Sequence, residues 1–305
     1  MIGVSEIKTF RPASRLSLKE ITQDLKLTQQ QYDKLRKQGL KQVMSSGDMT
    51  CFDMLHSLLR GCEGLWENDD LDCIIYAHAL QSHPDGHDLL DKLKMIHELQ
   101  DVPAFEISDL NCASSLMAIQ HACHRLRHSK KNKALILVAE KCYSPFLRTI
   151  TDISIISDGA ALCVLDRHTE NDIILDISMY IDCKITQSEH MDEETFKWFQ
   201  LSYFLGIKKV LQLSLKKTNK TLNDISLIIP HNVNIDTWSY MGKSMGIPSE
   251  KIFTENIGAL GHANTCDLFL NAEDVHQSKK LKSGDLYFMI SVGLGGAYTC
   301  MLMQR

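Results

Sequence analysis

The sequence contains no uninterrupted apolar stretch of the roughly 20 residues that a membrane-spanning helix needs. Its polar start, MIGVSEIKTFRPASR, has no apolar core of the kind found in signal peptides. No low-complexity linker separates one part of the chain from another. We therefore expect a cytoplasmic protein without a membrane partner, whose parts pack as one unit.

Closely paired cysteines are also absent. The ten cysteines stand singly, at positions 51, 62, 73, 112, 123, 142, 163, 183, 266 and 300, and no two form a CxxC pair. This scatter favours free thiols in a reducing compartment over a disulfide framework. Cysteine and histidine do not occur at the paired spacing of zinc ligands either, so we expect no bound metal.

An excess of basic charge is lacking as well. The 305 residues carry a net charge of -5, whereas a nucleic-acid partner needs a concentrated basic face. The only basic runs are HSKKNK and HQSKKLK, each between a helix-like and a strand-like stretch. We interpret them as solvated loops, with docking of a carrier protein as the alternative. The composition, 44% hydrophobic and 23% charged, is that of a globular protein.

Short apolar runs bounded by polar turns predict buried strands, and segments of helical period lie between them. The predicted strands are residues 71–79, 133–140, 160–166, 224–232 and 285–293, with a final strand in YTCMLMQ. The helical segments include SSLMAIQHACHRL and residues 199–215. Alternating strands and helices indicate an α/β layered fold.

Each half of the sequence repeats one pattern: a strand after an Asn-Asp turn, a helix-like stretch and a second strand. The centres of these two strands lie 62 positions apart in the first half and 60 in the second. We therefore predict an internal duplication, with one half at 1–166 and the other at 167–305. A site at the junction would collect residues from both halves.

Cys112 stands where the strand-like EISDLN gives way to a helix opened by Ala113, Ser114 and Ser115. Free backbone N–H groups at a helix N-terminus favour the thiolate, which is the form that a nucleophile requires. The alternative is a small buried apolar residue. Cys112 is the candidate nucleophile.

Two histidines occupy comparable positions in the second half. His231 stands at the end of the strand ISLIIP, and His262 lies in GALGHANTCD, a turn that leads into a helix as the Cys112 turn does. With Cys112 they would supply a base or donor for the thiol and a donor for a thioester carbonyl. The glycine-rich GLGGAYT allows either an oxyanion hole or a plain turn.

Five motifs occur in one order: VPAFEISDLNCASSLMAIQHA, LILVAEKCYS, SDGAALCVL, IIPHNVN and GLGGAYTCMLM. In that order they resemble motifs of the β-ketoacyl-acyl-carrier-protein synthase III group of the thiolase superfamily. The resemblance extends from about Asp70 to the C-terminus and is weaker over the first 60 residues. It implies a thiolase-like five-layered αβαβα fold with two duplicated halves, a homodimer, and attack by cysteine on an acyl thioester.

Carried over by position, the resemblance makes Cys112 the acyl-accepting cysteine and His231 the histidine of the HQAN-like stretch, here HNVN. Gly296 resembles the glycine whose N–H joins that of Cys112 in an oxyanion hole. The turn from Asp158 to Ala160 is interpreted as structural. Asn234, at the end of HNVN, is expected to support the site.

The chain departs from the family where condensing members have Gly-Asn-Thr-Ser. Here His262 replaces the asparagine, and Asn264 matches only with a gap in the alignment. Asp267 is expected either to orient the His262 imidazole or, as the preferred interpretation, to favour the N-terminus of the following helix. The substitution leaves condensation and simple acyl transfer both open.

The resemblance predicts an acyltransferase that uses an acyl-CoA or acyl-carrier-protein thioester as substrate and needs no cofactor. The main hypothesis is a synthase III-like condensing enzyme of fatty-acid, polyketide-type or secondary metabolism. The alternatives are transfer of an acyl chain to a hydroxyl, an amine or a carrier, and a non-catalytic subunit of a homologous synthase. The aromatic-rich stretch 196–210 is interpreted as helix core, with lining of an acyl tunnel or dimer packing as alternatives.

Overall fold

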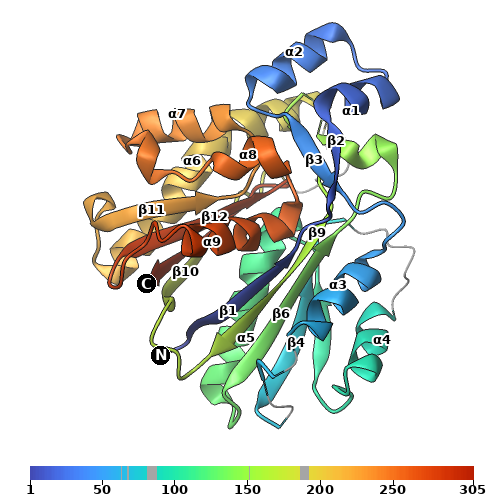
Figure 1. Cartoon of the computed structure of the whole chain (residues 1–305). Coiled ribbons are helices and arrows are strands. Elements are labelled where there is room, and N and C mark those ends of the chain that lie inside the picture. Colours follow the sequence, from blue (N-terminus) through green and yellow to red (C-terminus); the bar gives the residue numbers. More distant parts are fainter. Residues whose placement is uncertain (63, 67–68, 81–87, 151, 186–191) are drawn as a thin grey trace.

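A sheet of nine strands runs through the computed structural model, which describes residues 1–62, 64–66, 69–80, 88–150, 152–185 and 192–305 (Figure 1). Its order is β11-β12-β13-β10-β1-β9-β6-β4-β5. The strands are β1 (Gly3–Phe10), β4 (Leu71–Ala77), β5 (Ala104–Ile107), β6 (Lys133–Glu140), β9 (Gly159–Asp166), β10 (Ile173–Ile181), β11 (Ile225–Pro230), β12 (Leu286–Gly293) and β13 (Ala297–Gln304). All six predicted strands are confirmed, and β5 corresponds to the strand-like stretch before Cys112, while β1 and β10 were not predicted.

The sheet consists of two half-sheets. Strands β4 and β6 pair in parallel in the first half, as β11 and β12 do in the second, and the remaining neighbours of each half, apart from the parallel pair β4–β5, are antiparallel. The half-sheets meet between β1 and β10, where Gly3 pairs with Ile173. A junction this short lets them turn their inner faces toward a shared layer of helices.

That shared layer consists of α5 and α9, whose apolar residues form one core cluster with strands of both halves. A second cluster lies between the second half-sheet and α6 and α7, and a third between the first half-sheet and α3 and α4. The five-layered α/β arrangement is therefore confirmed. The main helices are α3 (Cys51–Arg60), α4 (Leu89–Ile96), α5 (Ser114–His128), α6 (Glu193–Thr218), α7 (Ile235–Met245), α8 (Glu255–Leu260) and α9 (Asp267–Gln277).

Two separate segments, residues 14–45 and 149–155, pack against the core of the second half and carry further small elements (Figure 1). Ser17 and Thr28 begin their two helices with capping boxes, because each hydroxyl accepts the N–H of the third helical residue. Their strands form two-stranded pairs. These elements are α1 (Leu18–Asp24), α2 (Gln29–Lys37), β2 (Ser14–Ser17), β3 (Gln42–Ser45), β7 (Thr149–Ile150) and β8 (Ser154–Ile155).

The two halves follow the same sequence of elements. The short 3-10 helices η1 (Asn111–Ala113) and η5 (Asn264–Cys266) precede α5 and α9 respectively. The counterpart of β5 in the second half is reduced to one parallel bridge, between Ile228 and Ile252. The division at residue 166 stays a prediction; β9 ends there and β10 begins at Ile173.

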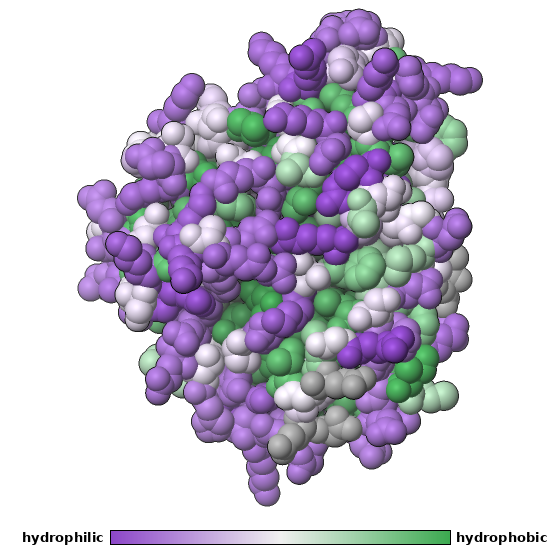
Figure 2. All heavy atoms as spheres, in the orientation of Figure 1, coloured by the Kyte–Doolittle hydropathy of each residue, from purple (hydrophilic) through white to green (hydrophobic). Residues whose placement is uncertain are grey.

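No helix of the described residues is long and apolar enough to span a bilayer. On the face shown in Figure 2, hydrophilic side chains predominate over α1, α2 and α7, and the apolar patches are small and separated. Most of the buried apolar residues of the described chain are gathered in the three core clusters, whereas single side chains such as Phe146 and Leu201 are exposed.

Asp158 connects segments that are distant in the sequence. Its carboxylate accepts the backbone N–H of Ser46 at 2.9 Å and that of Cys142 at 3.0 Å, and it pairs with the Arg148 guanidinium at 2.7 Å. Both charged side chains are largely buried. These contacts agree with the structural role predicted for this turn.

We expect Asp158→Ala to lower the free energy of unfolding by about 3 to 5 kcal/mol, because it leaves Arg148 buried without its partner. Urea denaturation measures the change. Lys92→Ala is the control, since Lys92 pairs with Asp88 on the exposed side of α4 and should cost less than about 1 kcal/mol. Equal losses in the two variants would contradict the structural role of Asp158.

Candidate active site

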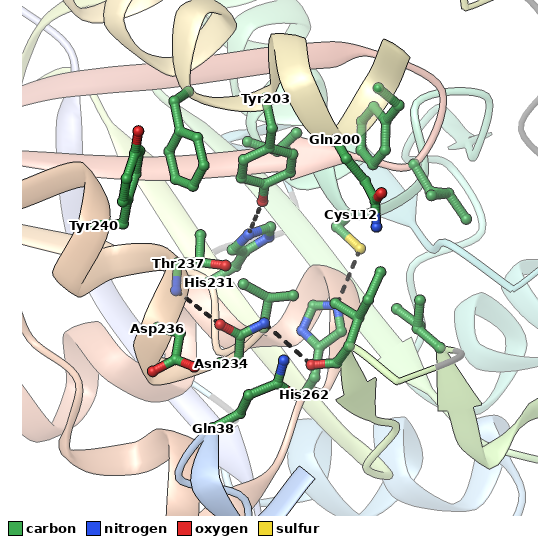
Figure 3. Close-up of a pocket in the computed structure, with 17 residues that line it drawn as sticks. Gln38, Cys112, Gln200, Tyr203, His231, Asn234, Asp236, Thr237, Tyr240 and His262 are labelled. Atoms are coloured by element: carbon green, nitrogen blue, oxygen red, sulfur yellow. Dashed lines mark hydrogen bonds between the residues drawn. The ribbon is translucent and has the colours of Figure 1, made fainter. Parts of the chain in front are cut away.

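A cavity of about 380 Å³ lies beside the C-terminal ends of β11 and β12, where His231 and Val292 line it (Figure 3). Cys112, His231 and His262 all line it. Most of the remaining wall is aromatic or aliphatic and includes Phe199, Tyr203, Phe204, Val233, Tyr240, Val292 and Leu294. A mostly apolar cavity with a few convergent polar groups is the usual form of a small-molecule site.

Cys112 lies in η1, between β5 and α5, as the sequence predicted. Asn111 adopts a left-handed conformation with φ 50°, which aims the next residue into the cavity. Ser291 donates its hydroxyl to the Cys112 carbonyl at 2.8 Å. A Cβ on Gly293 would lie 2.0 Å from the Leu110 carbonyl oxygen, so glycine is required for β12 to approach this turn.

His262 lies between the Cys112 sulfur and the Asp267 carboxylate and contacts both. Its Nε2 lies 3.5 Å from the Cys112 sulfur, and its Nδ1 lies 2.5 Å from Asp267 Oδ2. Burial alone would lower the pKa of His262, but the Asp267 carboxylate and the Cys112 sulfur raise it to about 10. His262 is therefore an imidazolium at neutral pH, placed to accompany a thiolate.

Asp267 has more than one role. Its carboxylate also accepts the backbone N–H groups of Asn232, at 2.6 Å, and Ala263, at 2.7 Å. It is the first residue of α9 and completely buried. The orientation of His262 that the sequence offered as the second interpretation is thus present together with the preferred helix-start role.

His231 is held in a different environment. The Trp238 indole donates to its carbonyl oxygen at 2.9 Å, and its Nε2 lies 2.9 Å from the Tyr203 hydroxyl. Burial and the neighbouring His262 charge hold the pKa of His231 well below its usual value. The two rings lie 5.4 Å apart, one neutral and one charged.

The two predicted supporting asparagines differ in position. Asn264 Oδ1 lies 3.5 Å from the Cys112 sulfur, and its φ of 48° matches that of Asn111 in the equivalent turn. Asn234 instead caps α7, where it accepts the N–H of Thr237 at 2.8 Å and donates to Ile153 at 3.1 Å. Asn234 lines the cavity but is committed to these backbone contacts.

The backbone N–H of Gly296, for which the resemblance predicts an oxyanion role, is engaged within its own turn, and that role stays a prediction. This N–H donates to the Gly293 carbonyl at 3.1 Å, and the Gly296 α-carbon faces Ile185 and Asp182. Leu294, two residues earlier, lines the cavity with Cys112, and its carbonyl accepts from the Asn111 amide at 2.7 Å. The turn between β12 and β13 therefore places Leu294 in the cavity wall, while its Gly296 N–H is bonded to the Gly293 carbonyl.

The ligand atoms of Cys112, His231 and His262 lie within 4.8 Å of one another, so these residues are the ones that would hold a metal. Each histidine already has a hydrogen-bond partner on one ring nitrogen. The expectation that the site works without a metal stays a prediction.

A model of the 3-oxoacyl-[acyl-carrier-protein] synthase III C-terminal family matches residues 215–305. β-Ketoacyl-[acyl-carrier-protein] synthase III of Aquifex aeolicus is 25% identical over 213 residues, 67% of each chain. The mycobacterial synthase III of Mycolicibacterium paratuberculosis is 25% identical over 264 residues, 78% of this chain and 76% of the relative. The chain is thus similar in sequence to β-ketoacyl-acyl-carrier-protein synthase III, most clearly over its last third.

Solved structures show the same fold. The acyltransferase ChlB3 superposes with a TM-score of 0.87 at 18% identity, covering 99% of this chain and 97% of its own. The Aquifex aeolicus synthase III gives 0.83 at 20% identity over the whole of both chains. Xanthomonas campestris OleA, solved with bound lauric acid and lauroyl-CoA, gives 0.84 at 13% identity, covering 100% and 99%.

Two residues that line the cavity, Tyr203 and Leu294, were not singled out in the sequence. Tyr203 lies in the stretch 196–210, which was interpreted as helix core with lining of an acyl tunnel as an alternative. Phe199 does belong to the core, so that interpretation was incomplete rather than wrong. The signal was the density of aromatic residues, which a water-facing helix does not need.

We expect Asp267→Asn to slow alkylation of Cys112 by iodoacetamide at pH 7.5 by 10-fold or more, since each pKa unit corresponds to roughly a tenfold change in the charged population. Without the carboxylate the His262 pKa falls, and the imidazolium that accompanies the thiolate is lost as pH rises through that lower value. In the wild type His262 should stay charged from pH 6 to 9, below its pKa of about 10.

Peptide mass spectrometry of Cys112 gives the rate. Asp274→Asn is the control, because Asp274 lies on the same helix and pairs with Arg11 away from the thiol. An unchanged rate in Asp267→Asn would contradict the imidazolium–thiolate pair.

Proposed function

We propose that the chain is an acyl-transferring condensing enzyme that carries the acyl group as a thioester on Cys112. The main support for this proposal is the buried Cys112 thiol in an aromatic-lined cavity. Its sulfur lies 3.5 Å from His262, which the buried Asp267 carboxylate keeps charged. The acyl donor is a CoA or acyl-carrier-protein thioester, and no cofactor takes part.

In the first half-reaction, the Cys112 thiolate attacks the thioester carbonyl and the bond to the leaving sulfur breaks. The His262 imidazolium gives its Nε2 proton to the departing thiolate, so charge is balanced and the acyl-enzyme faces a neutral ring. The developing oxyanion is held by backbone N–H groups. We assign these to Cys112 and Leu294, because Gly296 uses its N–H within the turn.

In the second half-reaction, a malonyl-type thioester loses carbon dioxide, and its enolate carbon attacks the acyl-enzyme carbonyl. The C–S bond to Cys112 breaks and the thiolate is regenerated. Donors for the enolate oxygen come from the His231 side of the cavity and from His262 with its neighbour Asn264, whose Nδ2 is buried without a partner among the described residues.

A second candidate is transfer of the acyl chain to a hydroxyl or amine. The observation that favours it is the Asp267–His262 pair, because an imidazole oriented by a carboxylate is what deprotonation of such a nucleophile requires. The proton would pass from the nucleophile to His262 Nε2 as the new bond forms and the bond to Cys112 breaks.

The assembly that we propose is a cytoplasmic homodimer. Strand β5 lies at an edge of the sheet, and its outer side, unpaired within the described part of the chain, would be available to a second copy. The metabolic context that we propose is fatty-acid or polyketide-type synthesis, including secondary metabolism, since both use acyl thioesters on carriers.

We expect intact-protein mass spectrometry to show one acyl group added to the wild type by a panel of acyl-CoA and acyl-carrier-protein thioesters, and none added to Cys112→Ala. Cys183→Ala is the matched control, since Cys183 is the exposed free cysteine of the described chain and the one open to non-specific acylation. It should keep the adduct. An adduct that persists in Cys112→Ala and disappears in Cys183→Ala would refute the assignment.

The loaded enzyme then separates the two candidate functions. With a malonyl thioester, condensation releases carbon dioxide and a product two carbons longer than the acyl group. Discharge onto hydroxyl or amine acceptors, with no release of carbon dioxide from the malonyl thioester, would select the second candidate.

A further inference from the structure

The Tyr203 hydroxyl occupies the space in front of His231. It reaches into the cavity from α6 and lies 2.9 Å from His231 Nε2, the nitrogen that would otherwise face a substrate (Figure 3). Cys112 and His262 line the same cavity. Within this cavity the Tyr203 phenol therefore occupies the Nε2 side of the His231 ring.

The protonation states fix the direction of this hydrogen bond. Burial holds the pKa of Tyr203 well above its usual value, so the phenol keeps its proton, and His231 is neutral. A neutral imidazole has one N–H, and His231 Nδ1 is buried with no partner among the described residues. An orphaned N–H is rarer than an orphaned lone pair, so the proton belongs on Nε2 and is donated to the Tyr203 oxygen.

The phenolic proton of Tyr203 is then free to point into the cavity. The ring itself is held by its neighbours, with Phe199 at 5.4 Å and Tyr298 at 6.1 Å between ring centroids, both near edge-to-face. A donor held rigidly in a largely apolar cavity is the arrangement that stabilises developing negative charge most effectively. His231 polarises the phenol further by donating to its oxygen.

We propose that Tyr203 is a catalytic residue of the second half-reaction, whose hydroxyl donates to the substrate oxygen on which negative charge develops, and that His231 acts through it as a positioning residue. This inference rests on the proposed function. It assigns the first step to Cys112 and His262, and the donor on the other side of the cavity to Tyr203.

The test is Tyr203→Phe, which removes only the hydroxyl. Acylation of Cys112, followed by intact mass, should stay within threefold of the wild type. Discharge of the isolated acyl-enzyme by a malonyl thioester, or by a hydroxyl or amine acceptor, should slow by about 100-fold, the usual effect of losing one such donor. Tyr298→Phe makes the same change on the adjacent ring, which is buried outside the cavity, and should leave both steps unchanged.

Two further measurements separate catalysis from packing. Fluorotyrosines of decreasing phenol pKa at position 203 should speed the discharge step in order of acidity, which a purely structural role would not do. His231→Gln should cost less in the Tyr203→Phe background than in the wild type, because His231 acts through the phenol.

The outcomes are distinguishable. An unaltered discharge rate in Tyr203→Phe, or equal slowing of acylation and discharge with a lowered melting temperature, would overturn the role of Tyr203 alone. Failure of the wild type to form any acyl-enzyme would overturn the proposed function itself.

Discussion

The buried carboxylate of Asp267 is the contact on which the site depends. It accepts from the His262 ring and from the backbone N–H groups of Asn232 and Ala263, and so joins the loop after β11 to the turn before α9. One turn further along α9, Asn271 donates to the carbonyl of Pro230. The same helix thus positions both histidines. Because α9 is packed between the two half-sheets, the core holds the side chains of the candidate site in place.

The duplication explains how such a site arises. Asn111 and Asn264 adopt the same left-handed conformation before α5 and α9, so Cys112 and Thr265 occupy equivalent positions. Cys112 faces the cavity, whereas Thr265 donates its hydroxyl to buried Glu140 at 2.5 Å. Burial raises the pKa of Glu140 to about 7, against the effect of its hydrogen bonds. One turn carries the proposed nucleophile, and the equivalent turn makes a contact between the halves.

Several features of the site could be predicted because they follow from local pattern. A cysteine between a strand and an amphipathic helix, and a histidine at a strand end, are visible in the sequence without knowledge of tertiary packing. The backbone N–H that completes the oxyanion hole could not be chosen from the sequence, because the choice between Gly296 and Leu294 depends on which N–H the turn uses internally. Tyr203 could not be chosen from its aromatic-rich stretch for a different reason: helical period shows that one face is buried, but not which part of this face borders a cavity. The first strand and β10 were missed since their burial is partial or alternating, unlike the continuous apolar runs.

In the proposed mechanism, the protonation state of His262 favours condensation over simple transfer. After acylation the Cys112 thiolate charge is gone, but Asp267 still faces His262 at 2.5 Å and continues to favour the charged ring. Solvent can therefore return a proton to the ring once the first leaving group has departed. A charged His262 is a strong donor to an enolate oxygen, and decarboxylation creates the carbon nucleophile without any base. Transfer to a hydroxyl starts instead from a neutral ring that accepts a proton. Asp267 orients that ring and makes it a stronger base, as the second candidate requires, but it also lowers the population of the neutral form. In the proposed mechanism the Asp267 carboxylate therefore serves both steps, because it keeps His262 charged beside the thiol and as a donor to the enolate oxygen.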